Sequence, residues 1–166
     1  PDQRQIDAAV SEGREDAVDF IAGELGMTVL PSQTAVNGAA ANGRVTLLAN
    51  KCPGWEVFPD TDGANGASKN GHLEVLKWLA SLEIYPNQHG ADLAAGNGHL
   101  DVLKWLATVE VYPTRFGANR AAGNKHLDVL EWLATLEPEH RVYPDQCGAN
   151  LAAVNGDLQM LNFLST

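Results

Sequence analysis

The stretch that decides the fold is GADLAAGNGHLDVLKWLATVEVYPTRF, residues 90–116. The same pattern precedes it as GANGASKNGHLEVLKWLASLEIYPNQH at 63–89, and it returns as GANRAAGNKHLDVLEWLATLE from Gly117 and as GANLAAVNGDLQMLNFL from Gly148. The starting glycines are 27, 27 and 31 residues apart, and the four extra residues of the third copy fall within Pro138–Val142. A fixed period of this length predicts an array of one repeated supersecondary unit.

Weaker copies extend the array toward the N-terminus. AVNGAAANGRVTLL aligns from Ala35 and QIDAAVSEGREDAVDFIA from Gln5, so repeats start near residues 5, 35, 63, 90, 117 and 148. A second set of markers keeps the same register, with spacings of 28, 27, 27 and 31: Pro31, Pro59, Pro86, Pro113 and Pro144. We therefore expect one all-α domain over residues 1–166, with the first and last repeats as caps that carry a wetter outer face.

Each repeat is predicted to contain two short antiparallel helices. The first covers a segment such as Gly90–Gly96, whose small residues allow close approach of the backbone. Asn97 and Gly98 then form a turn, because both residue types tolerate a positive φ. The second helix follows in HLDVLKWLA, residues 99–107, where apolar residues recur at helical spacing. Pro113 blocks its continuation, and helices this short require stacking between repeats to be stable.

The repeated residues resemble the ankyrin-repeat family. NGHLEVLKWLA is similar to the second-helix signature of that family, and GANLAA stands where its TPLHLAA first helix would be. The resemblance covers about residues 5–166 and implies an ankyrin-type solenoid of about six helix-turn-helix repeats. The departures are a glycine at the family's Pro position and, at its His position, Asn65, Asp92, Asn119 and Asn150.

The period of 27 residues is shorter than the family's usual period of about 33. It resembles a short subclass that is abundant in protists and giant viruses. Six residues fewer between the helices imply that the β-hairpin fingers of the family are shortened or absent.

The composition argues against several classes of partner. The 21 acidic and 11 basic residues give a formal net charge of −10, whereas nucleic-acid affinity depends largely on Lys and Arg that neutralise phosphates. No window approaches the roughly 18 to 20 continuous apolar residues that cross a bilayer. We therefore expect neither a nucleic-acid nor a membrane partner. Seven acids and two bases within residues 1–24 carry half of the net charge, which we interpret as part of the N-terminal cap.

The glycine-rich and acidic segments do not match cofactor or metal motifs. GANGASKNGH lacks the GKS or GKT ending of a phosphate loop, and the acidic segment from Asp60 has Gly71 where a calcium loop requires Glu. Histidines recur every 27 residues, at His72, His99 and His126. We interpret them as turn residues that hydrogen-bond the backbone across repeats rather than as metal ligands.

The two cysteines, Cys52 and Cys147, are 95 positions apart, and we expect both to be reduced, buried thiols. Cys147 is close to His140 in the sequence, but variation at a surface position explains it better than a catalytic nucleophile does. The chain contains no catalytic signature motif. It is therefore predicted to be no enzyme and to bind no cofactor.

The positions that vary between repeats are the candidates for recognition. They are the three residues after each in-phase proline and the start of the first helix, a phase that lines the concave face in ankyrin-type stacks. Aromatic and arginine side chains are the usual energetic anchors of interfaces. The candidate protein-binding residues at this phase are Asp62, Gln88, His89, Arg115, Phe116 and Arg120.

Trp55 is a further candidate, in the second repeat. Asn50 and Lys51 stand where other repeats have Trp and Leu, and Pro53-Gly54 is expected to end the helix early. Leu47 and Leu48 must then hold this repeat. Trp55 either folds back into the place of the missing tryptophan, which we favour, or is exposed as an interface residue.

We expect a non-enzymatic, monomeric module that binds a protein partner through its concave face. The alternative is a structural spacer or a self-associating scaffold subunit. The resemblance implies an intracellular setting, in the cytoplasm or nucleus, or delivery into a host cell as a pathogen or viral effector. The sequence begins at Pro1 rather than Met, which leaves room for a removed leader or a neighbouring domain.

Overall fold

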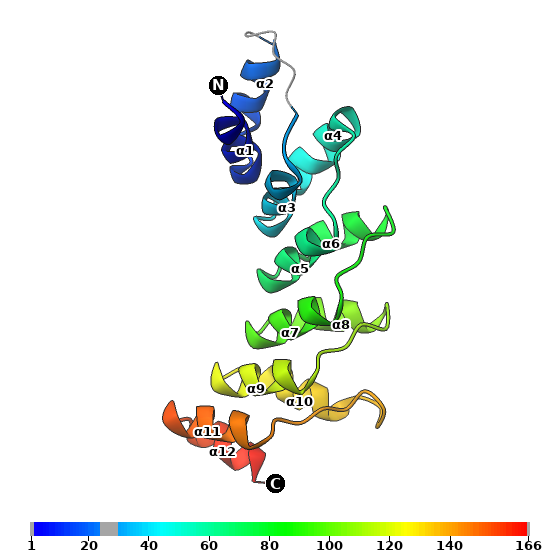
Figure 1. Ribbon diagram of the computed structural model, residues 1–166. Coiled ribbons are helices and arrows are strands. Elements are labelled where there is room, and N and C mark those ends of the chain that lie inside the picture. Colours follow the sequence, from blue (N-terminus) through cyan, green and yellow to red (C-terminus); the bar gives the residue numbers. More distant parts are fainter. Residues whose placement is uncertain (1, 24–29, 166) are drawn as a thin grey trace. The chain divides into compact units, whose positions relative to one another are not determined.

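The computed structural model describes residues 2–23 and 30–165, and these form twelve helices with no strand among them (Figure 1). The chain divides into two compact units, Pro1–Pro86 and Asn87–Thr166, each of which holds three helix pairs. The N-terminal unit contains α1 (Gln3–Glu12), α2 (Glu15–Gly23), α3 (Gln33–Ala41), α4 (Val45–Trp55), α5 (Thr61–Lys69) and α6 (Leu73–Ala80). The C-terminal unit contains α7 (Gln88–Gly96), α8 (Leu100–Ala107), α9 (Arg115–Gly123), α10 (Leu127–Thr135), α11 (Gln146–Val154) and α12 (Leu158–Leu164). Glu24, the last acid of the predicted N-terminal cap, lies outside the described residues.

Successive pairs pack through their first helices within each unit. In the N-terminal unit α3 lies between α1 and α5, and in the C-terminal unit α9 lies between α7 and α11. Each first helix also packs against the second helix of its own pair. The predicted helix-turn-helix repeats and their order are thus confirmed within each unit.

The first helices begin earlier than predicted, because a capping residue precedes each of them. For example, α7 begins at Gln88 rather than at Gly90. In α7 the side chain of Asn87 accepts a hydrogen bond from the backbone N–H of His89 at 3.0 Å. Residues of the preferred N-cap types also follow the other in-phase prolines. Asp60, Thr114 and Asp145 accept from the N–H two residues further on, and Ser32 accepts from the N–H three residues further on. Variation directly after each proline is therefore a choice among capping residues.

The turn between the two helices requires a left-handed backbone at a single position. Gly98 has φ 77°, whereas Asn97 has φ −109°, so only the glycine of the predicted turn pair uses its conformational freedom. The third copy of the sequence has Lys125 at this position, with φ 68°. A non-glycine residue is strained in this region.

The second helices bury the large apolar side chains. Leu76 and Leu79 of α6, and Leu103 and Leu106 of α8, have no exposed surface. In the second repeat Leu47 and Leu48 are buried, as predicted.

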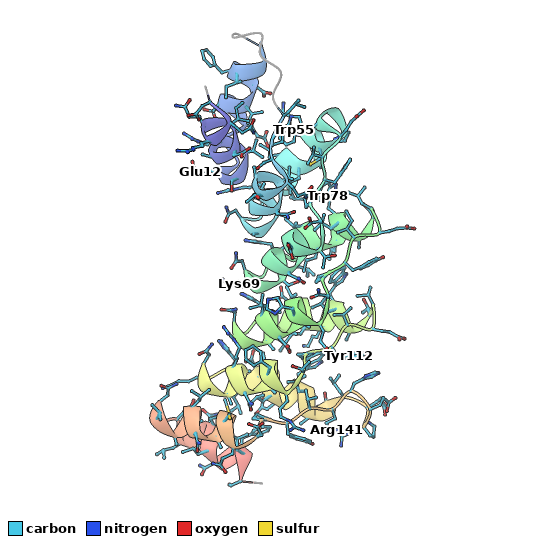
Figure 2. All side chains as sticks on the ribbon, viewed as in Figure 1. Glu12, Trp55, Lys69, Trp78, Tyr112 and Arg141 are labelled. Atoms are coloured by element: carbon cyan, nitrogen blue, oxygen red, sulfur yellow. The ribbon has the colours of Figure 1, made fainter. Side chains whose placement is uncertain are left out.

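The expected early end of α4 is wrong. The helix continues through Pro53 to Trp55, and Glu56 follows it with φ 56°. Trp55 is 8% exposed and lies in the core (Figure 2). The core interpretation is therefore confirmed, and Trp55 is withdrawn as an interface candidate.

A tight turn follows the second helix where the resemblance implied a shortened finger. After α8 the N–H of Val111 donates to the carbonyl of Leu106 at 3.0 Å, and the N–H of Glu110 donates to that of Ala107. Glu110 is left-handed, with φ 58°. This is a Schellman motif with glutamate in the place where glycine is usual, and Glu83 occupies the same place after α6.

Polar side chains of the first helices join consecutive repeats. Asn37 of α3 accepts from the backbone N–H of Asp60 at 3.0 Å and donates to its carboxylate at 2.8 Å. Asn119 of α9 forms the same two bonds with Asp145. These asparagines stand at equivalent positions of their repeats, so the same residue type joins consecutive repeats in both units.

Hydrogen bonds from side chains to backbone across repeats also come from asparagines that end the first helices. Asn124 donates to the carbonyl of Gly96 at 2.6 Å, and Asn70 donates to that of Ala41 at 2.7 Å. His126 packs against Gly98, where an added Cβ would come within 2.4 Å of the imidazole Nδ1.

The two thiols have different environments. Cys52 is buried, as expected, and this burial raises the pKa of its thiol to about 11. Cys147 is exposed in the first turn of α11, so the expectation that it is buried was wrong. The second position after the cap faces solvent in α11, as it does in α7 with His89 and in α9 with Phe116.

Candidate functional site

The candidate residues at the variable phase all lie on first helices. Asp62 is exposed in the first turn of α5 and belongs to the N-terminal unit. Gln88 and His89 occupy the first turn of α7, and Arg115 and Phe116 that of α9; all four are exposed. The C-terminal unit therefore gathers five of the candidates, the fifth being Arg120, on two helices that pack together.

Phe116 and Arg120 form a pair on the surface of α9. The Phe116 ring is 56% exposed, and the guanidinium carbon of Arg120 lies 5.7 Å from its centroid. A cation placed over an aromatic face at this distance is attracted to it. The pair thus presents a large apolar ring that is already oriented.

Gly96 of the neighbouring helix makes room for Arg120. An added Cβ at Gly96 would come within 2.7 Å of the Arg120 Nε. That Nε is buried, and no hydrogen-bond partner for it is found among the described residues. The arginine side chain is therefore wedged between α7 and α9, and its position depends on a glycine.

Asp92 fixes the start of α9. Its carboxylate accepts hydrogen bonds from the backbone N–H of Thr114 at 2.6 Å, from the Thr114 hydroxyl at 2.8 and 3.0 Å, and from the N–H of Gly117 at 3.2 Å. The Thr114 hydroxyl also accepts from the N–H of Phe116. The exposed residues Arg115 and Phe116 thus lie between two groups held by one buried carboxylate.

Arg115 also influences the start of α11. A hydrogen bond from the backbone N–H of Cys147 lowers the pKa of Asp145, and the amide of Asn119 and the nearby charge of Arg115 act in the same direction. Asp145 therefore stays ionised in its role as N-cap, which suits the positive end of a helix dipole.

A cavity of about 550 Å³ lies beside this surface in the C-terminal unit. Gln88 and Arg115 line it, and the remaining lining comes largely from the connections that follow α8 and α10: Glu110, Tyr112, Pro113, Thr114, Glu139, His140 and Val142. In Figure 2, Tyr112 and the neighbouring Arg141 lie on these two connections. The cavity thus offers aromatic, acidic and basic groups together.

The four-residue insertion in the third copy of the sequence builds one wall of this cavity. It places the His140 ring on the Tyr112 ring, with centroids 3.9 Å apart and an interplanar angle of 7°. Arg141 stabilises the inserted segment, because its guanidinium donates two hydrogen bonds to the carbonyl of Leu136. The tyrosine hydroxyl points to the carbonyl of Ala107, at 3.4 Å.

Sequence reasoning missed Tyr112, His140, Glu110 and Glu139 as parts of one site. The available signal was the insertion at Pro138–Val142, which interrupts an otherwise constant period. His89, Phe116 and Arg120 do not line the cavity and belong to the adjoining helix surface.

No model of a protein family and no curated protein matches this chain. The resemblance to ankyrin repeats therefore rests on the residues themselves. Over the described ranges, no helix combines the length and apolar character needed to cross a membrane. Within residues 2–23 and 30–165, no three His, Cys, Asp or Glu side chains gather in a way that would hold a metal ion.

Proposed function

We propose that this chain is an ankyrin-type solenoid whose first-helix surface binds a protein partner. The observation that carries the proposal is the exposed Phe116 ring, 56% accessible and paired with Arg120 beside a cavity of about 550 Å³. Exposed aromatic and arginine side chains at the centre of a preformed surface are typical of interface anchors. In this proposal the protein neither catalyses a reaction nor binds a cofactor.

The support for a solenoid comes from the regular contacts inside each unit. The same polar tie joins α3 to Asp60 and α9 to Asp145, and an aspartate replaces the asparagine in α7. A repeat that contacts its neighbours in a constant way can be extended as a linear array. The proposal includes two further points. The partner binds the concave face of the solenoid, and this protein works in the cytoplasm or nucleus, or as an effector in a host cell.

A triple substitution tests the surface. Arg115→Ala, Phe116→Ala and Arg120→Ala together remove the anchors, and we expect loss of partner capture from a cell lysate, measured by quantitative mass spectrometry. The matched control carries Lys104→Ala, Asp128→Ala and Glu131→Ala, which change exposed residues on the second helices of the same unit. Circular dichroism checks that both variants fold.

Unchanged capture by the folded triple variant would remove this surface from consideration. Loss of capture in the control alone would place the interface on the second helices instead. A photo-crosslinker at position 116 identifies the partner directly and reports which of its residues lie against the ring.

A further inference from the structure

Two arginines line a second cavity of the C-terminal unit, which we call the arginine cavity. It has a volume of about 350 Å³ and adjoins the larger cavity described above, because the two share Arg115 and Val142. Arg141 lies on the connection after α10 (Figure 2), and both arginines are exposed. The complete lining of the arginine cavity is Arg115, Arg141, Val142, Tyr143, Pro144 and Asp145.

Neither arginine belongs to the repeated sequence pattern. Arg115 is the second residue after an in-phase proline, and this position is uncharged in the other repeats, where it is Gln33, Thr61, Gln88 and Gln146. Arg141 lies within the insertion at Pro138–Val142, which the other connections lack. Because the other repeats fold without these two charges, the stacking of helix pairs does not explain them.

The guanidinium of Arg115 is available to a ligand. In the N-terminal unit the equivalent Gln33 joins α3 to the next connection, because its amide donates to the carbonyl of Phe58 at 2.8 Å. The Arg115 side chain makes no such bond, and it forms no ion pair with any residue that the structure describes. A charged group of this kind gains from a partner that supplies the opposite charge.

Arg141 is held in place and still has unused donors. Its guanidinium donates to the carbonyl of Leu136 at 2.9 and 3.1 Å. A guanidinium has more N–H donors than these two bonds use, and over the described ranges no carboxylate forms an ion pair with Arg141. Since this side chain is already ordered, binding a ligand costs it less conformational entropy.

The carboxylates nearby do not cancel both positive charges. Asp145 caps α11, where it accepts from the backbone N–H of Cys147 at 2.8 Å and from the amide of Asn119 at 2.9 Å. Two arginines and one aspartate leave a formal charge of +1 on the lining of the arginine cavity. Glu110 and Glu139 line the larger cavity and repel an anion there. An anionic group is therefore favoured in the arginine cavity alone.

We propose that the arginine cavity binds one carboxylate of an acidic side chain in the protein partner. The inference rests on the proposed function, because it takes a protein as the ligand, and it adds the chemistry of the contact. The planar fork of a guanidinium matches the two oxygens of a carboxylate. Val142, Tyr143 and Pro144 offer apolar contact to the methylene groups of the same side chain.

The charge of the cavity favours a carboxylate over a phosphate. A phosphorylated side chain carries about −1.5 to −2 at neutral pH, whereas the cavity lining offers a formal charge of +1. The chain as a whole has a net charge of −10, and it repels a doubly charged group more strongly than a singly charged one. A single Asp or Glu is therefore the better match.

Selection from a random peptide library displayed on phage tests this chemistry without knowledge of the natural partner. We expect the full wild-type chain to enrich peptides that have Asp or Glu at one fixed position. Arg115→Gln with Arg141→Gln should lose this enrichment. The matched control is Lys77→Gln with Lys104→Gln, which removes the same amount of charge from exposed positions of α6 and α8 and should keep it.

Fluorescence anisotropy with one selected, labelled peptide then measures the contact itself. Arg115→Gln should weaken binding by about tenfold or more, and the substitution should have little effect on a peptide whose acid is replaced by its amide. Circular dichroism checks folding. Arg141→Gln loses the bonds to Leu136, but the Arg115 side chain forms no hydrogen bond among the described residues, so Arg115→Gln keeps the test valid if Arg141→Gln unfolds.

Several outcomes would overturn the inference. They are a library that enriches no peptide, enriched peptides without a fixed acid, and tighter binding when phosphoserine replaces the acid. Peptides that depend on Phe116 but not on an acid would contradict the arginine cavity and still support the proposed surface of α9. Acid-dependent binding that Phe116→Ala leaves unchanged would support the arginine cavity and count against Phe116 as an anchor.

Discussion

In α7 the buried positions are mostly glycine, alanine and one aspartate, whereas in α8 they are Val102, Leu103 and Leu106. The two helices of one repeat are thus held by different forces. Small residues let α7 and α9 approach closely, and Asp92 fixes their register through directed hydrogen bonds. The second helices contribute volume, because leucine side chains gain stability from being removed from water. The first helices therefore define position and the second helices supply most of the burial.

The largest expected effect comes from the second helix. Leu103→Ala removes a fully buried side chain and leaves a cavity, so the free energy of unfolding should fall by about 3 kcal/mol. Urea unfolding followed by circular dichroism measures the change. Lys104→Ala, an exposed neighbour on the same helix, should shift the value by less than about 0.5 kcal/mol. Equal losses in the two variants would contradict the division between the helices.

The second-largest expected effect concerns the hydrogen bonds that fix the register of the first helices. Asp92→Ala leaves the N–H groups of Thr114 and Gly117 without their acceptor, and the free energy of unfolding should fall by about 2 kcal/mol. Asp92→Asn should recover much of the loss, because Asn119 accepts from the next cap in the same way. Chemical unfolding of both variants measures the difference. If alanine and asparagine cost the same, the hydrogen bonds do not set the register.

The smallest expected effect concerns backbone strain in the turn between the two helices. Lys125→Gly relieves a left-handed φ of 68°, and the free energy of unfolding should rise by about 1 kcal/mol. Lys69→Gly changes the same residue type at the end of α5, where the backbone is helical, and should lower stability by about 0.5–1 kcal/mol. Thermal unfolding of the pair should give opposite signs. A loss at both sites would show that strain at Lys125 is not the controlling term.

The helical repeats were predictable from the sequence because the pattern of apolar residues and the prolines recur with the same period. The capped starts were not assigned, since Ser, Asp, Asn and Thr look variable in letters but are equivalent as N-cap acceptors. The length of α4 was misjudged for a related reason. Pro53 lacks an N–H, but in the last turn the remaining bonds, together with the left-handed Glu56, still carry the helix to Trp55.

The candidate site was predictable only in part. The exposure of Arg115 and Phe116 follows from their place in the first turn, which the repeat alignment gives. The stacking of His140 on Tyr112 depends on how an inserted segment folds back, and no periodic signal encodes that geometry. The pairing of Arg120 with Phe116 likewise required three-dimensional placement, although their spacing of four residues on one helix is compatible with it.

Within each unit, polar ties run forward from a first helix to the cap of the next pair, as Asn37 does to Asp60 and Asn119 to Asp145. The donor and the acceptor of such a tie therefore belong to consecutive repeats. Duplication or deletion of one whole 27-residue segment would leave each remaining tie with a partner of the same kind. The gene for such a chain can change length in steps of one repeat without creating orphaned buried groups, so copy number is open to variation while the contact chemistry stays constant.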